Sequence, residues 1–175
     1  MPTKANILVD KTGHACLADF GLLTIALESA SLFPSSSDIQ GGTVRWMSPE
    51  LIHPEQFGLK KRCPTESSDC YALGMVIYEI IGGHPPFHGH TDIAVSIKVL
   101  SGERPPRGAR FTDDLWEILG LCWVPQPSDR PSIEDVLQRL EAISDSLEPP
   151  SPGVDEVEEY SNYWDSASGS GDGLL

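Results

Sequence analysis

Three short blocks of this chain carry side chains that could take part in group-transfer chemistry. They are Asp19-Phe20-Gly21, Gly42 to Glu50, and Asp129-Arg130-Pro131. Phosphoryl transfer requires a carboxylate that binds Mg²⁺ and a positioned loop that holds the acceptor. The first block offers such a carboxylate in Asp19, and the second offers such a loop. The residue types therefore favour phosphoryl transfer. This reaction is possible only if the surrounding elements bring these blocks together.

The three blocks, in this order and at these separations, resemble the large lobe of a eukaryotic protein kinase. The resemblance covers roughly residues 3–144 and is greatest to the tyrosine-kinase-like group. It implies an α+β fold, mostly α, with a β-hairpin at the upper edge of the lobe. It also implies ATP-dependent phosphorylation of serine or threonine on a protein substrate, with ATP and Mg²⁺ as cofactors.

Asp19-Phe20-Gly21 is similar to the kinase metal-binding motif, in which the carboxylate holds Mg²⁺ and the aromatic ring packs into the core. Asn6 lies 13 residues earlier, where the family places the asparagine that binds the second Mg²⁺. The resemblance therefore implies that Asn6 and Asp19 bind the metal and, through it, the nucleotide.

The residues just before Asn6 depart from the family. The positions of the family's catalytic aspartate and lysine fall on Met1 and Thr3. Methionine cannot accept a proton and threonine carries no charge, while Lys4 is one residue out of register. No Gly-rich loop, ATP-pairing lysine or catalytic aspartate precedes the motif in this sequence. We therefore expect this chain to be an inactive, incomplete copy, and the alternative is a non-catalytic kinase-like interaction module.

The stretch Gly42 to Glu50 resembles the end of a kinase activation segment, with Ser48 in place of the usual alanine. Activation-segment and substrate-docking roles are implied for Phe20, Gly21, Gly42, Thr43, Arg45 and Trp46. Thr43 favours serine or threonine as the acceptor. Glu50 is expected to form a structural ion pair with Arg130 inside the lobe.

Asp69 has two interpretations. It matches the family aspartate that anchors the backbone of the catalytic loop, and it could equally be a helix N-cap within Ser67-Ser68-Asp69.

The elements that must position these residues follow from local patterns. Short β-leaning runs at 6–9 and 15–18 flank Asp10-Lys11-Thr12-Gly13, which predicts a hairpin. Residues 22–42 predict a long surface loop.

A helix is expected to begin within 67–69 and to end at Ile81. It is apolar on nearly every face and is stopped by Gly82-Gly83. Gly74 within this helix indicates tight packing. Three further helices are expected. The first spans 92–100, with Ile93, Ile97 and Leu100 on one face, and the second spans 113–123 and is capped by Thr112. The third spans 132–144, and its apolar stripe consists of Ile133, Val136, Leu137, Leu140 and Ile143.

The chain has 175 residues and a formal net charge of -14. Arg139 is the last of the 12 Lys and Arg residues, and nine acidic residues follow it. This distribution argues against nucleic acid or membrane as a partner and favours a protein substrate or partner. Without a leader pattern or a long apolar run, we expect the cytoplasm or nucleus. Cys70 and Cys122 are expected to be buried, and none of the four cysteines has metal-ligand spacing.

We expect residues 1–147 to form the kinase-like lobe and 148–175 to form a disordered acidic tail, because the tail offers little apolar area to offset its ordering entropy. The alternative is that the tail's few apolar residues, Val154, Val157, Tyr160, Tyr163 and Trp164, dock on the lobe. His84, His88 and His90 lie close together in the sequence, but no carboxylate or cysteine completes a metal-ligand set beside them.

Overall fold

The computed structural model describes residues 7–17 and 44–146. Contacts divide the chain into two units, Met1–Ser144 and Asp145–Leu175. The expected loop over 22–42 and the expected tail from 148 lie outside the described residues. So do Met1, Asn6, Asp19, Phe20, Gly21, Gly42 and Thr43.

The predicted hairpin is confirmed. Strands β1 (Ile7–Val9) and β2 (Ala15–Leu17) pair antiparallel, with Ile7 opposite Leu17. The Asp10 carboxylate accepts hydrogen bonds from the backbone N–H of Thr12 at 2.8 Å and of His14 at 2.9 Å. Gly13 has φ +87°, a left-handed conformation that glycine adopts without strain. The turn residues thus close the hairpin through an Asp side chain and one glycine.

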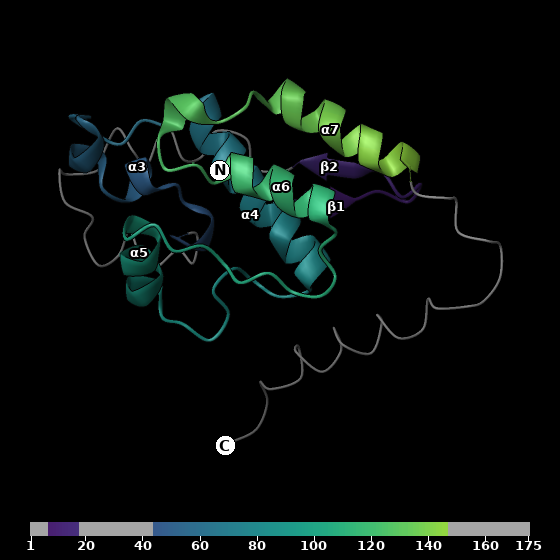
Figure 1. Cartoon of the computed structure of the whole chain (residues 1–175), viewed down its shortest axis with the longest axis horizontal. Coiled ribbons are helices and arrows are strands. Elements are labelled where there is room, and N and C mark those ends of the chain that lie inside the picture. The colour runs from purple at the N-terminus through teal and green to yellow at the C-terminus, as the bar shows by residue number, and fades with distance from the viewer. Residues whose placement is uncertain (1–6, 18–43, 147–175) are drawn as a thin grey trace, which may run out of the picture. The chain divides into compact units, whose positions relative to one another are not determined.

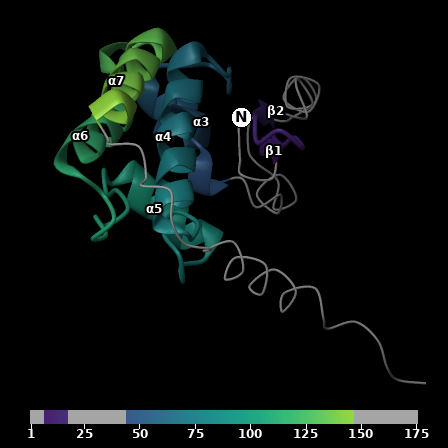
Figure 2. The ribbon, with the colours of Figure 1, turned by 90° about the vertical axis from the view of Figure 1, so that its right-hand side faces the viewer.

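Helices joined by irregular segments make up the rest of the described chain, which confirms the mostly α fold. Five α-helices follow one another: α3 (Pro49–Ile52), α4 (Glu66–Gly82), α5 (Asp92–Leu100), α6 (Asp113–Cys122) and α7 (Ile133–Ser146). Short 3₁₀ helices lie at Val44–Trp46 (η2), Pro54–Phe57 (η3) and Pro127–Asp129 (η4). Helix α4 packs against α6, η2 and η4, while α5 packs against η2 and α3. Figures 1 and 2 show α4 between α6 and α3.

Helix α4 begins earlier than the sequence predicted. Thr65 is its N-cap, because the Thr65 hydroxyl accepts from the Ser68 N–H at 3.2 Å and the Ser68 hydroxyl accepts from the Thr65 N–H at 2.9 Å. This reciprocal capping box satisfies two N–H groups at the helix start. The predicted N-cap within Ser67-Ser68-Asp69 is therefore wrong, and Asp69 lies inside the first turns. The predicted stop is confirmed, since Gly83 caps the helix with φ +78°.

The core is built around α4. Its residues Cys70, Tyr71, Ala72 and Met75 are fully buried, and Val76 and Tyr78 nearly so. The helix is not enclosed on every side as predicted, because Ile80 is 59% exposed. The uniform apolar composition of α4 gave no sign of this exposed edge, which depends on where the neighbouring helices lie.

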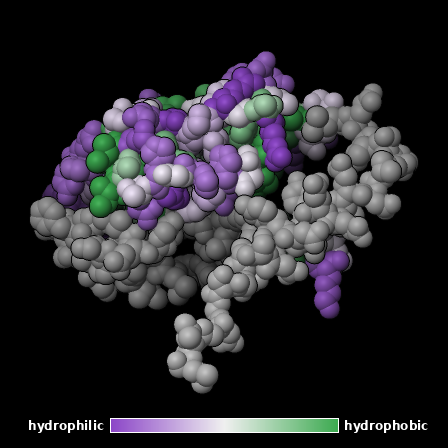
Figure 3. All heavy atoms as spheres, turned by 90° about the horizontal axis from the view of Figure 1, so that it is seen from below, coloured by the Kyte–Doolittle hydropathy of each residue, from purple (hydrophilic) through white to green (hydrophobic). Residues whose placement is uncertain are grey.

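Helix α5 has the predicted bounds, but the buried face is not the one that carries Ile93 and Ile97. Val95 and Val99 are buried, whereas Ile93 and Ile97 are 69% and 64% exposed. Apolar residues occur on several sides of this helix, so their spacing did not identify the face that packs. Figure 3 shows one face of the described surface, on which hydrophilic residues predominate and hydrophobic ones occur in small groups.

Helices α6 and α7 agree with the predicted caps. The Thr112 hydroxyl accepts from the Leu115 N–H, and the Ser132 hydroxyl accepts from the Asp135 N–H at 3.1 Å. Ile118, Leu119 and Cys122 of α6 are buried, as is Val136 of α7. The predicted burial of both Cys70 and Cys122 is confirmed. The stripe on α7 is only partly covered, because Ile133 and Leu137 are exposed.

The predicted tight packing at Gly74 is confirmed and gives a first testable prediction. A Cβ atom at this position would lie 2.7 Å from Trp123 Nε1 and 2.8 Å from the Cys122 Cβ. Gly74→Ala gains about 1 kcal/mol of helix propensity but costs about 1–3 kcal/mol in overpacking, so we expect a net loss of stability of about 1 kcal/mol. Urea unfolding measures it. The control is Gly120→Ala in α6, where a Cβ meets nothing within 4 Å and stability should rise.

Candidate functional site

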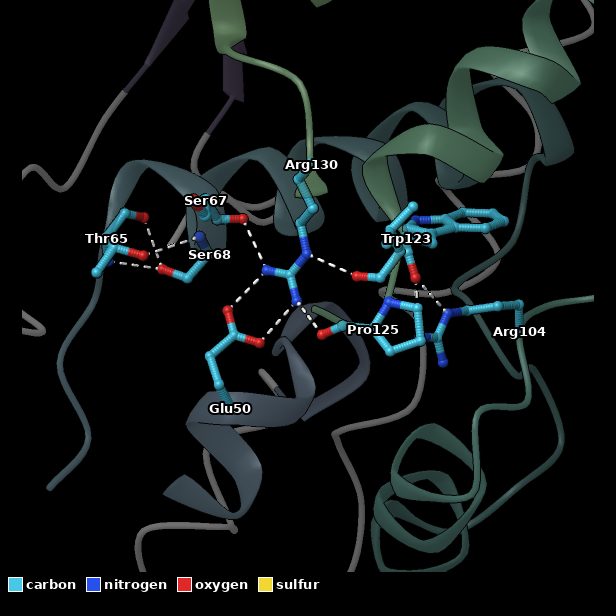
Figure 4. Close-up of polar contacts among 9 residues, drawn as sticks. Glu50, Thr65, Ser67, Ser68, Arg104, Trp123, Pro125 and Arg130 are labelled. Carbon is cyan, nitrogen blue, oxygen red and sulfur yellow. Dashed lines mark hydrogen bonds and ion pairs between the residues drawn. The ribbon is translucent and has the colours of Figure 1, made fainter. Parts of the chain in front are cut away.

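The centre of the site is an ion pair between residues 80 positions apart in the chain. Glu50 lies in the first turn of α3, and Arg130 directly follows η4. Arg130 Nη1 lies 2.6 Å from Glu50 Oε1, and Arg130 Nη2 lies 2.7 Å from Glu50 Oε2. The two side chains are buried, with Glu50 2% and Arg130 7% exposed. Figure 4 shows this bidentate arrangement, the strongest hydrogen-bonded geometry available to an arginine and a carboxylate.

The remaining N–H groups of Arg130 also have partners. Nη1 donates to the Ser67 carbonyl at 2.9 Å, Nη2 donates to the Pro125 carbonyl at 3.1 Å, and Nε donates to the Val124 carbonyl at 2.8 Å. These bonds use all five N–H donors of the guanidinium. A charge buried in this way has its desolvation cost offset by a complete hydrogen-bond shell. Arg130 therefore joins α3, the start of α4 and the segment after α6 (Figure 4).

The aromatic ring of Tyr71 lies beside this network. The Arg130 guanidinium carbon is 5.1 Å from the ring centroid, and that of Arg104 is 5.4 Å away. Arg104 in turn donates to the Trp123 carbonyl through Nε at 3.0 Å and Nη2 at 2.8 Å, as Figure 4 shows. Burial raises the pKa of Tyr71 to about 12. Tyr71 thus stays neutral and contributes a cation–π surface to both arginines.

Arg45 is engaged with the loop between α4 and α5. Nη1 donates to the Pro86 carbonyl at 3.0 Å and to the Phe87 carbonyl at 2.9 Å. Nη2 donates to the His90 carbonyl and lies 3.4 Å from Asp92 Oδ1. The side chain is only 18% exposed. The Arg45 guanidinium is therefore bound by groups of the same chain, and these bonds hold the α4–α5 loop against η2.

Trp46 and Asp69, two further predicted site residues, both contact or belong to α4. Trp46, 8% exposed, donates from Nε1 to Glu79 Oε2 of α4 at 3.2 Å, which ties η2 to the central helix. Asp69 is half-buried, and burial raises the pKa of its carboxyl. The interpretation of Asp69 as the N-cap is wrong, and its interpretation as an anchor for the catalytic loop stays a prediction, since residues 1–6 are outside the described part.

The structure therefore brings together Glu50 with Arg130, and places Arg45 and Trp46 against α4 and the loop after it. The predicted metal ligands Asn6 and Asp19 lie outside the described residues, as do Phe20, Gly21, Gly42 and Thr43, so their roles stay predictions. Within residues 7–17 and 44–146, no three His, Cys, Asp or Glu side chains are grouped to hold a metal ion. In the same ranges, no helix has the length and apolar character needed to cross a bilayer.

Four further residues take part in these networks although no sequence motif singled them out: Tyr71, Glu79, Asp92 and Arg104. Arg104 lies between Glu103 and two prolines, and its partners are backbone carbonyls, which carry no residue-specific signal. Glu79 was detectable in principle, because it is the one charged residue in the apolar stretch 70–82 of α4. Such a residue normally has a polar partner.

Ser48 gives a second prediction. It replaces the alanine of the family pattern, is 0% exposed, and its hydroxyl has no hydrogen-bond partner in the described part of the chain. An unsatisfied buried hydroxyl costs about 1–3 kcal/mol, so Ser48→Ala should raise the free energy of unfolding by about 1 kcal/mol. The matched control is Ser68→Ala, which breaks the α4 capping box and should lower stability by about 1 kcal/mol. A loss of stability in Ser48→Ala would show that the hydroxyl has a partner after all.

Comparison with known proteins bears on this geometry directly. Residues 3–140 match the family model described as protein tyrosine and serine/threonine kinase. A probable serine/threonine-protein kinase of Dictyostelium discoideum is 32% identical over 142 residues, covering 81% of this chain and 14% of that protein. The serine/threonine-protein kinase PkaA of Streptomyces coelicolor is 32% identical over 146 residues, 82% of this chain and 25% of that protein.

A third relative, the dual specificity protein kinase shkC of Dictyostelium discoideum, is 31% identical over 144 residues, 79% of this chain and 26% of that protein. The chain thus spans about a quarter or less of the length of these relatives. The family match extends over most of the chain and includes both partners of the buried Glu50–Arg130 pair. This chain therefore belongs to the protein tyrosine and serine/threonine kinase family.

Proposed function

We propose that this chain is the large-lobe part of a kinase that transfers phosphate from ATP to serine or threonine on a protein. The single observation that carries the proposal is the buried Glu50–Arg130 pair, because it joins the end of the activation-segment motif to Asp129-Arg130-Pro131 within a chain that matches the kinase family. The names of two of the three relatives support serine and threonine as acceptors, while the third is a dual specificity kinase.

Each residue has a definite task under this proposal. Asp19 and Asn6 would hold Mg²⁺ on the ATP phosphates, which neutralises charge that develops during transfer. Glu50 and Arg130 hold the end of the activation segment to the lobe. Arg45 and Trp46 brace the same segment against the α4–α5 loop and α4, and Thr43 would lie near the acceptor. A protein substrate fits the acidic composition of the chain, which disfavours nucleic acid and anionic membrane as partners.

A second candidate is a non-catalytic module that offers the kinase large-lobe surface to a protein partner. The observation that favours it is the presence of Met1 and Thr3 at the positions of the catalytic aspartate and lysine. Neither side chain can perform the corresponding step, which is alignment of the acceptor hydroxyl or neutralisation of the γ-phosphate.

The transcript upstream of the Met1 codon separates the two candidates. The kinase proposal predicts an in-frame Gly-rich loop, a lysine on a following strand and a His-Xaa-Asp motif. The longer polypeptide should then label serine and threonine, and not tyrosine, when incubated with labelled ATP and Mg²⁺. An upstream stop codon, or an upstream reading frame without those motifs, would refute the kinase proposal and leave the interaction module.

A further inference from the structure

A pocket of about 490 Å³ is lined by nine residues, among which neither Glu50 nor Arg130 occurs. Its walls come from the end of α4, the α4–α5 loop, α5 and the segment after α5. Aromatic rings and cations line the same space, and this combination is the reason to consider it as a binding site.

The aromatic wall is held in place by its own contacts. Tyr78 is 2% exposed, and its hydroxyl donates to the Pro106 carbonyl at 3.0 Å. The His84 ring lies edge-on to Tyr78, with centroids 5.8 Å apart, and the His88 ring lies 5.7 Å from that of His84. Phe87 adds a fourth ring to the lining. Tyr78 is already stacked on Phe111, with ring centroids 5.1 Å apart, so it and Phe87 back the wall, and the exposed rings of His84 and His88 are the ones against which a planar aromatic ligand could pack.

The opposite wall carries positive charge. Arg104 is fixed by four hydrogen bonds to the carbonyls of Trp123, Val99 and Glu103. Lys98 Nζ lies 2.7 Å from Glu103, whose side chain is 56% exposed. An ion pair this exposed adds little stability, so an anionic ligand can replace Glu103 as the partner of Lys98. Two cations against one carboxylate leave the pocket basic in a chain of net charge -14.

The loop that forms the histidine wall is fixed before any ligand binds. Phe87 has φ +54°, a conformation that a non-glycine residue adopts only when its surroundings hold it there. Arg45 supplies that hold through the Pro86, Phe87 and His90 carbonyls. A pocket wall that is already ordered saves the entropic cost of ordering it on binding.

We propose that this pocket binds an aryl phosphate, with the ring against His84 and His88 and the phosphate toward Lys98 and Arg104. A phosphate dianion has enough acceptor oxygens for the Lys98 ammonium and for the one Arg104 N–H that remains beyond its four bonds to carbonyls. The ligand is either a free aryl phosphate or a phosphotyrosine side chain of a peptide. This site does not depend on the proposed phosphoryl transfer.

Amide spectra of the 175-residue protein test the proposal, with phenyl phosphate, inorganic phosphate and phenol titrated separately. We expect saturable shifts at 84–90 and 98–106, and a Kd for phenyl phosphate at least tenfold lower than for either other probe. Lys98→Ala and His88→Ala should each raise that Kd at least threefold. Lys60→Ala and His53→Ala, which remove exposed side chains outside the pocket, should leave it unchanged.

A phosphotyrosine peptide identifies the source. Binding as tight as that of phenyl phosphate supports a protein-borne ligand, and binding of phenyl phosphate alone supports a small molecule. Equal Kd values for inorganic and phenyl phosphate, or a Kd unaffected by both pocket variants, would overturn the proposal. Melting curves of each variant establish that it is folded, and His88 is exposed, so its loss is not expected to unfold the chain.

Discussion

Glu50→Ala and Arg130→Ala are each expected to lower the free energy of unfolding by about 3–5 kcal/mol. Each change leaves a buried charge without its partner, and Arg130 additionally anchors three backbone carbonyls. The double variant should cost clearly less than the sum of the two, because removing both partners leaves no uncompensated carboxylate. Urea unfolding of the four proteins gives the coupling energy directly.

The matched control is the exposed pair of Glu117 and Arg139, whose side chains are 72% and 52% exposed and 3.9 Å apart. Glu117→Ala should change stability by less than about 1 kcal/mol, because solvent screens such pairs. If Glu50→Ala and Arg130→Ala were as mild as this control and additive, the ion pair would not hold the lobe together.

The second large effect concerns activity. The 175-residue polypeptide is expected to transfer no phosphate, although it contains the proposed metal ligands Asn6 and Asp19. Positioning and electrostatic stabilisation supply almost all the catalysis of this reaction. By the spacing of the family motif, the positions of the acceptor-aligning aspartate and the phosphate-binding lysine fall on Met1 and Thr3, so we expect both positioning and charge stabilisation to be largely lost.

Local signals predicted much of the fold. The hairpin and the helices α6 and α7 follow from turn and capping residues such as Gly13, Thr112 and Ser132, which act on backbone groups only a few positions away. The buried face of α5 did not follow, since Val95 and Ile97 are equally apolar and only tertiary packing distinguishes them. The start of α4 was missed because several adjacent hydroxyls could cap it, and Thr65 and Ser68 pair reciprocally.

Contacts within the candidate site could be predicted from the sequence where both contacting residues have charged side chains that belong to a motif. Glu50 and Arg130 were expected to pair from the family motifs, and the structure places them in bidentate contact. The interactions of Arg45 and Arg104 were not predictable, because their acceptors are mainly carbonyls, which every residue has. The pocket beside α4 was likewise hidden, since Tyr78, Lys98 and Arg104 come from three separate elements.

Phosphate transfer from labelled ATP tests the central claim most directly. The assay compares the 175-residue polypeptide with the longer chain encoded by the transcript, and it includes the Asp19→Asn variant of each. The account predicts label on serine and threonine from the longer chain only, and its loss in Asp19→Asn. Turnover by the 175-residue polypeptide that disappears in Asp19→Asn, or label from the longer chain that persists in Asp19→Asn, would contradict it.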